Sequence, residues 1–126
     1  MDPKQRYFVR EIHLACGQQP LIYGRSLFPR ATYARCRGQL DRLGRRPLGE
    51  WLFSDPRIYR QFTQIGRIGR RSRLYERALS GLSHRPDMLW GRRSVFIVSE
   101  QPLLVLEIFL PALITCIHTS GKSKTS

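Results

Sequence analysis

The segment that decides the fold, residues 7–29, reads YFVREIHLACGQQPLIYGRSLFP. Two runs rich in β-branched and aromatic residues flank a short turn that contains glycine and proline, which is the pattern of a β-hairpin. Residues 92–111 repeat the arrangement, with the runs RRSVFIVS and LLVLEIFL around a turn that contains EQP. The sequence therefore predicts two β-hairpins, one near each end of the chain, and hence an antiparallel sheet.

The two hairpins align with each other at a single offset of 82 residues. Residues 19–22 (QPLI) match residues 101–104 (QPLL), and Pro29 matches Pro111. The same offset aligns four charged strand residues, Arg10 with Arg92 and Arg25 with Glu107. We interpret the match as an internal duplication, with chance similarity as the alternative.

The segment between the hairpins is predicted to be helical. Thr32 is a candidate N-cap for a helix that ends at Gly44, because glycine is common just beyond a helix end. Asp55 and Pro56 together are a start signal for a helix over residues 57–64. Two further helical segments are expected at residues 47–53 and 71–82. The chain therefore belongs to the α+β class, with helices expected on one face of the antiparallel sheet.

Length and composition fit a single domain. The chain has 126 residues, of which 41% are hydrophobic, and this is enough for one modest core. Its formal net charge is +13, and arginine supplies most of the excess. Arginine favours planar anions, so nucleic acid, an anionic membrane and an anionic metabolite all fit this charge.

Cysteine usage and the N-terminal sequence favour a reducing compartment. The three cysteines, Cys16, Cys36 and Cys116, form neither a disulfide framework nor a zinc motif. The first residues lack the apolar core and cleavage site of a secretory signal. Residues 103–117 are the most apolar stretch, but a glutamate and a proline interrupt them, and a membrane helix needs ~20 apolar residues. We therefore expect a cytoplasmic protein without a membrane span.

Two charged residues lie on strand segments that are otherwise apolar. Alternation places Arg10 beside Phe8 and Ile12 on the more apolar face of its strand, and Glu107 is the only polar residue in LLVLEIFL. A buried carboxylate without a partner is costly or takes up a proton, so we expect Glu107 to be buried against a cation. Together the two residues predict a pocket for a compact dicarboxylate, with Arg10 as an anion anchor and Glu107 as an acid/base group.

Each of these residues could instead have a purely structural role. Arg10 could extend along its neighbours to solvent, and Glu107 could form an ion pair that only fixes strand register. Arg25 could serve the same anion or only solvate the sheet. Residues 67–77 contain five arginines that could follow a phosphate backbone, but such a run is usually a solvated helix face. Aromatic residues do not alternate regularly with it, so we do not expect nucleic acid to be the main partner.

Four segments together resemble the chorismate lyase family, whose members remove pyruvate from chorismate to form 4-hydroxybenzoate for ubiquinone biosynthesis. The segments are RYFVREIHLACGQQPLIYGRSLFP, LGRRPLGEWLF, LWGRRSVF and QPLLVLEIFLP, in the order of the family. The resemblance implies a duplicated helix and strand unit that forms a six-stranded antiparallel sheet. It also implies a ligand enclosed beneath helical flaps, with neither a metal nor an organic cofactor, and we expect a monomer.

The resemblance implies roles for individual residues. Arg10 in VREI would bind a substrate carboxylate, and Glu107 in LEIFLP would face the opposite end of the ring, near the hydroxyl of the product. Leu48 in PLG would contribute backbone contacts, and Arg25 in YGRS would line the route in or out. Arginine stabilises the negative charge that develops on the departing fragment, and glutamate can relay a proton. The resemblance thus predicts a lyase with Arg10 and Glu107 as catalytic residues.

The chain also departs from the family pattern. It starts where the second strand of the family starts, so a single domain over residues 1–111 is expected to lack the N-terminal helices and the first strand. Residues 112–126 are an expected C-terminal extension, partly disordered. Two alternatives to an active lyase therefore stay open. One is a non-catalytic remnant that binds 4-hydroxybenzoate, and the other, less favoured, is a basic nucleic-acid-binding protein.

Overall fold

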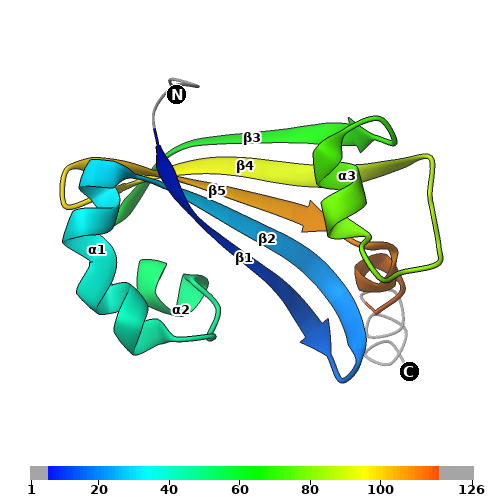
Figure 1. The fold of residues 1–126 in the computed structure, drawn as a ribbon, viewed down its shortest axis with the longest axis horizontal. Helices are drawn as coiled ribbons and strands as arrows, with labels where there is room; N and C mark the ends of the chain where they lie inside the picture. The colour runs from blue at the N-terminus through cyan, green and yellow to red at the C-terminus, as the bar shows by residue number, and fades with distance from the viewer. Residues whose placement is uncertain (1–5, 117–126) are drawn as a thin grey trace, which may run out of the picture.

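The chain folds into one antiparallel sheet with helices packed against it (Figure 1). We describe it from a computed structural model, which covers residues 6–116. Within these residues, five strands lie in the order β1-β2-β5-β4-β3, so β1 and β3 are the edge strands. The elements are, in chain order, β1 (Tyr7–Cys16), β2 (Gln19–Pro29), α1 (Arg30–Leu43), α2 (Gly49–Leu52), β3 (Tyr59–Gly69), α3 (Arg73–Ala78), β4 (Met88–Val98) and β5 (Gln101–Phe109). The predicted α+β class and antiparallel sheet are confirmed.

Both predicted hairpins are present, as β1 with β2 and as β4 with β5. Their turns occupy residues 17–18 and 99–100, which lie 82 residues apart, as the internal duplication requires. Gly17, Ser99 and Glu100 have the positive φ angles that tight hairpin turns favour. The turns of the two hairpins are therefore at equivalent positions in structure as well as in sequence.

One bulged residue, Leu21, makes the two hairpins different. Beside the turns they pair in the same way, but Leu21 has no partner on β1, and beyond it the register of the first hairpin is shifted by one residue. Arg92 therefore lies opposite Glu107 in the second hairpin. In the first hairpin, Arg10 lies opposite Ser26.

The helix predicted over residues 57–64 is wrong, because these residues enter strand β3. The Asp55 carboxylate does not cap a helix but accepts the Arg57 N–H at 3.0 Å, which forms a local turn. β3 then pairs with β4 along its whole length, apart from one irregularity near its start. Aromatic and β-branched residues favour a pleated strand, and the pairing with β4 overrides the local helix signal.

The helix predicted before Gly44 is confirmed, but it begins earlier than expected. α1 starts directly after Pro29, so Thr32 lies inside its first turn and is not the N-cap. The Thr32 hydroxyl instead donates to the Pro102 carbonyl at 2.7 Å and ties the helix to β5. At the other end, Gly44 has a φ of 61°, and its N–H donates to the Leu40 carbonyl at 3.1 Å.

The two shorter helices lie within predicted segments. α2 falls inside residues 47–53. α3 covers only the first part of residues 71–82; it begins after Ser72, whose hydroxyl accepts the Leu74 N–H at 3.2 Å. Beyond β5, residues 111–116 are helical, and residues 117–126 of the predicted C-terminal extension lie outside the described residues.

Two hydrophobic clusters occupy opposite faces of the sheet, because successive side chains of a strand point to opposite sides. The first cluster joins α1 and α2 to one face and consists of Phe28, Cys36, Leu43, Leu48, Leu52, Phe96, Val98 and Leu103. The second joins α3 to the other face and consists of Tyr23, Tyr75, Ala78, Leu79, Leu89, Ile108 and Leu110. Figure 1 shows α1 and α2 together at one end of the strands and α3 near the other end. The expected arrangement of helices on one face describes α1 and α2, whereas α3 packs against the opposite face.

The sheet has little room for a side chain at Gly91 of β4. A Cβ there would lie 2.8 Å from Ile68 Cδ1 and 3.2 Å from the carbonyl oxygen of Glu107. We expect Gly91→Ala to lower the free energy of unfolding by about 1–3 kcal/mol, because overpacking forces neighbouring groups apart. Urea unfolding followed by circular dichroism measures this loss.

Gly66→Ala is the matched control for this substitution. Gly66 lies on neighbouring β3, and a Cβ at this position would meet nothing within 4 Å. Its unfolding free energy should therefore change by no more than about 0.5 kcal/mol. Two variants of equal stability would show that the contacts at Gly91 yield easily and would contradict the prediction.

Candidate functional site

A pocket of about 190 Å³ lies on the sheet face that carries α2. All five strands contribute to it, and its charged lining residues are Arg10, Arg60 and Glu107. Most of the remaining wall is apolar and comprises Ile12, Leu14, Ile22, Gly24, Pro47, Leu48, Gly49, Leu52, Phe53, Phe96 and Val105. Ligand pockets of drug-like size enclose roughly 300–1,000 Å³. A smaller, mostly apolar pocket with a few charged groups suits a compact ligand.

Arg10 enters the pocket from the edge strand β1. One of its terminal nitrogens, Nη2, donates to the carbonyls of Gly44 and Arg46, which holds the end of α1 and the following loop against the sheet. The residue is half-buried, and burial lowers the pKa of the Arg10 guanidinium because water solvates the cation less well. Nη2 is the nitrogen committed to the protein, so the other N–H groups of the guanidinium are available to an anion in the pocket.

Glu107 enters the pocket from β5 and is paired with Arg92 across the β4–β5 ladder. Arg92 Nε donates to Glu107 Oε1 at 3.0 Å, and Arg92 Nη2 donates to Glu107 Oε2 at 3.1 Å. The expected cationic partner is therefore present. The expected burial of Glu107 is only partial, because its side chain remains 24% exposed. Arg92 orients the carboxylate, and pocket access leaves it within reach of a ligand.

Leu48 lies at the start of α2 and forms part of the pocket wall. It is buried, with 7% of its surface exposed, and packs in the cluster that joins α2 to the sheet. Its carbonyl accepts the N–H groups of Trp51 and Leu52, both at 3.1 Å. Any backbone hydrogen bond from Leu48 to a ligand would therefore come from its N–H.

Arg25 lies on the opposite face of the sheet from this pocket. It follows Gly24, which does line the pocket, so strand alternation turns its side chain away. Its guanidinium donates to the carboxylate of Glu11, which also accepts a hydrogen bond from Arg77 at 3.1 Å. The structure thus brings together Arg10, Leu48 and Glu107 but not Arg25. The contact of Arg25 with a ligand that the family resemblance implies is not supported for this pocket.

Arg60 and Arg92 contribute to the site but were missed as site residues from the sequence. Arg60 lies on β3, and the helix predicted over residues 57–64 hid its position on the sheet. Arg92 was aligned with Arg10 by the duplication, but its position opposite Glu107 depends on strand register. No apolar alternation marks β3 as a strand, so Arg60 is placed only by the pairing of β3 with β4.

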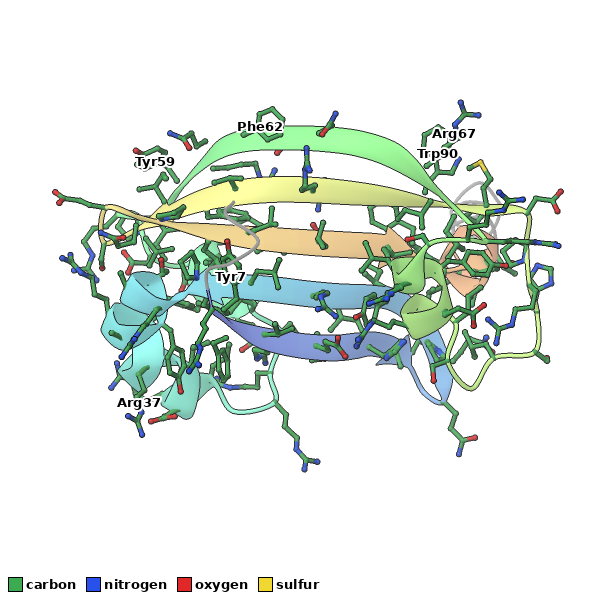
Figure 2. All side chains as sticks on the ribbon, turned by 45° about the horizontal axis from the view of Figure 1, so that its top comes forward. Tyr7, Arg37, Tyr59, Phe62, Arg67 and Trp90 are labelled. Atoms are coloured by element: carbon green, nitrogen blue, oxygen red, sulfur yellow. The ribbon has the colours of Figure 1, made fainter. Side chains whose placement is uncertain are left out.

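The arginines of residues 67–77 do not form one continuous basic face. The guanidinium of Arg67 lies 5.9 Å from the ring centroid of Trp90, and Figure 2 shows the two side chains close together. Arg70 pairs with Asp87 at 3.0 Å. Part of the run is therefore committed to separate local contacts, which weakens the interpretation as a track for a phosphate backbone.

Elsewhere, the described part of the chain offers fewer signs of a site. A larger cavity of about 670 Å³ lies between α1, the start of β3 and the turn between β4 and β5, and none of the four predicted site residues lines it. Among residues 6–116, no three His, Cys, Asp or Glu side chains gather closely enough to hold a metal ion. Nor does any helix in that range have the length and apolar character needed to cross a bilayer.

The sequence is similar to known chorismate lyases. The family model described as chorismate lyase matches residues 1–118. Two relatives, each named a probable chorismate pyruvate-lyase, are those of Nitrosomonas europaea, 39% identical over 86% of this chain, and of Azoarcus sp., 43% identical over 87% of it. A chorismate pyruvate-lyase of Salmonella arizonae is 37% identical over 89% of the chain.

These matches cover most of this chain but a smaller share of each relative. The chain spans only 61%, 60% and 57% of the lengths of the three relatives. Among solved structures, the C-terminal domain of Yurk from Bacillus subtilis is similar in fold, with a TM-score of 0.54 over 89% of this chain and 77% of that domain. Its sequence identity is 13%, so the likeness concerns the fold alone.

Proposed function

Because the chain belongs to the chorismate lyase family, we propose that it converts chorismate into 4-hydroxybenzoate and pyruvate. The observation that carries this proposal is the meeting of Arg10, Leu48 and Glu107 around one small pocket. The family resemblance assigns these same positions to the ligand. A pocket with a cation at one edge, a carboxylate near its middle and apolar walls suits a compact ring acid.

The ring of the ligand would lie over the sheet, between Arg10 of β1 and Glu107 of β5. Arg10 would hold the ring carboxylate through the donors that Gly44 and Arg46 leave unused, because a guanidinium matches the planar carboxylate. Glu107 would face the hydroxyl at the other end of the ring. The buried side chain of Leu48 would pack against the ring and exclude water from it.

The reaction is an elimination that makes the ring aromatic. A proton leaves the ring carbon that bears the hydroxyl, the ring C–O bond to the enolpyruvyl group breaks, and its electron pair departs with that group. The departing enolpyruvate takes up a proton and becomes pyruvate, so the atoms balance. Glu107, which lines the pocket, would accept the ring proton, and the arginines of the pocket would stabilise the anionic groups.

The proposal includes a cytoplasmic location and a monomeric state. The three cysteines are free thiols, and Cys36 is buried, which raises the pKa of its thiol. Unpaired cysteines suit the reducing cytoplasm, where the reaction is proposed to take place. The ligand pocket is built by one chain, which is consistent with a monomer as the working unit.

We expect purified protein to release 4-hydroxybenzoate from chorismate and to be stabilised by this product. At a ligand concentration 100 times the Kd, binding to the folded state adds about 2.7 kcal/mol, which raises the Tm by several degrees. Product absorbance measures turnover, and a thermal melt measures binding. Benzoate, which lacks the hydroxyl that Glu107 would bind, is the control ligand and should stabilise less.

The two readouts separate the proposal from its main alternative. Folded protein that is stabilised by 4-hydroxybenzoate but forms none of it from chorismate would be a binding remnant without lyase activity. Protein that neither turns over chorismate nor responds to 4-hydroxybenzoate would exclude both functions.

A further inference from the structure

Arg60 is a pocket cation to which no residue of the described range 6–116 offers a carboxylate or a carbonyl partner. It lies on the edge strand β3, and its guanidinium carbon is 5.8 Å from the ring centroid of Phe53 and 5.1 Å from that of Phe96. These aromatic faces attract the cation but do not accept its N–H groups in the plane of the guanidinium. The in-plane donors of Arg60 are thus free to bind an anion.

The charges of the pocket are unequal. Arg92 neutralises Glu107 through two hydrogen bonds. The charge of Glu107 therefore does not offset those of Arg10 and Arg60. Among residues 6–116, Arg10 donates only to neutral carbonyls, and Arg60 contacts only aromatic rings. Two positive charges therefore face a pocket whose other walls are mostly apolar. A ligand with two negative groups would compensate both, whereas a monocarboxylate would leave one without a counter-charge.

The two cations also approach the pocket from opposite sides. β1 carries Arg10 and β3 carries Arg60, and Figure 1 shows these strands as the two edges of the sheet. Four strand spacings of about 4.8 Å separate their backbones by roughly 19 Å, and both residues line the same pocket, Arg60 from its exposed rim. The cations are also offset along the strands. Arg60 pairs directly with Phe96 of β4, whereas the cross-strand pairs that start at Arg10 reach β4 at Ser94, two residues away.

We propose that Arg60 binds the carboxylate of the enolpyruvyl group. This inference rests on the proposed function and names the residue that distinguishes the dicarboxylate substrate from the monocarboxylate product. Arg10 holds the carboxylate that stays on the ring, and Arg60 holds the carboxylate that departs with pyruvate. Once pyruvate leaves, Arg60 has no further contact with the ring product.

The test compares the affinities of substrate and product in a variant that is expected to convert chorismate only slowly. Calorimetry with chorismate and with 4-hydroxybenzoate is carried out on Glu107→Gln and on Glu107→Gln combined with Arg60→Gln. The added Arg60→Gln should weaken chorismate binding by about 10- to 100-fold, the loss of charge-assisted hydrogen bonds. It should change the 4-hydroxybenzoate affinity by less than about threefold, because the product does not reach Arg60.

Two further variants guard against a general loss of structure. Arg60→Lys keeps the charge and should recover part of the chorismate affinity. Arg57→Gln removes a nearby arginine that is paired with Asp55 and lies outside this pocket, and both affinities should stay within about twofold. A thermal melt of each variant verifies that it folds.

The outcomes distinguish this inference from the proposed function. Equal losses for both ligands, or no loss for chorismate, would overturn the role of Arg60 while the lyase activity of the unmodified chain stood. Selective loss of chorismate binding, together with no turnover by the unmodified chain, would overturn the lyase function and keep Arg60 as a dicarboxylate-binding residue. Failure of the folded, unmodified chain to bind either ligand would overturn both.

Discussion

Replacing Arg10 with glutamine is expected to weaken 4-hydroxybenzoate binding by about 10- to 150-fold. The substitution removes the cation proposed to hold the ring carboxylate, and hydrogen bonds to a charged group contribute about 1.5–3 kcal/mol. It also removes the donors to the Gly44 and Arg46 carbonyls, so the loop that leads to Leu48 loses its attachment to β1. Isothermal titration calorimetry measures the affinity, and turnover of chorismate should fall at least as much.

Arg6→Gln is the control for the loss of a positive charge near this end of the sheet. Arg6 is exposed and directly precedes β1, outside the pocket. Long-range attraction alone would make both variants weaker by similar, salt-dependent amounts. An Arg10→Gln protein that folds and binds 4-hydroxybenzoate as tightly as the unmodified chain would exclude Arg10 as the carboxylate anchor.

Replacing Glu107 with glutamine is expected to lower the turnover of chorismate by about 100- to 1,000-fold. The amide keeps the shape of the side chain and one oxygen for Arg92, but it cannot accept the ring proton, and general base catalysis typically contributes factors of this size. The affinity for 4-hydroxybenzoate should change by only a few fold, because the amide oxygen still accepts from the hydroxyl of the product. Single-turnover measurements separate this chemical step from binding.

Glu11→Gln provides a matched control on the opposite face of the sheet. Glu11 also accepts hydrogen bonds from two arginines, Arg25 and Arg77, and it is likewise partly exposed. Its loss should cost no more than about 1 kcal/mol of stability and leave turnover unchanged. If both glutamine variants kept full turnover, the general-base role of Glu107 would be wrong.

The hairpins were predictable from the sequence, whereas strand β3 was not. The hairpin strands contain β-branched and aromatic residues in a period of two, with turn residues between them, and their long-range pairing agrees with these local signals. β3 has no buried residue, and all but one of its positions are exposed, so no apolar alternation marks it as a strand. Its identity depends on pairing with β4, which local sequence patterns do not encode.

The site was likewise predictable from the sequence only in part. Arg10, Leu48 and Glu107 followed from the motifs that contain them, and they line one pocket. The position of Arg25 also followed from a motif, but its neighbour Gly24 faces the pocket, so Arg25 cannot do so on the same strand. The pairing of Glu107 with Arg92 required the register of β4 with β5, which is set by the whole hairpin.

The unpartnered Leu21 of β2 shows how a repeated unit can diverge without many substitutions. In a bulge-free hairpin, Arg10 would face Arg25, just as Arg92 faces Glu107, and two like charges would lie side by side. One extra residue moves Arg25 opposite Glu11 and relieves that repulsion. In the second half of the repeat Glu107 pairs with Arg92, whereas no acidic residue of the described sheet pairs with the equivalent Arg10. A single shift in register thus separates two arginines, pairs Arg25 with an acid and leaves Arg10 opposite a neutral serine.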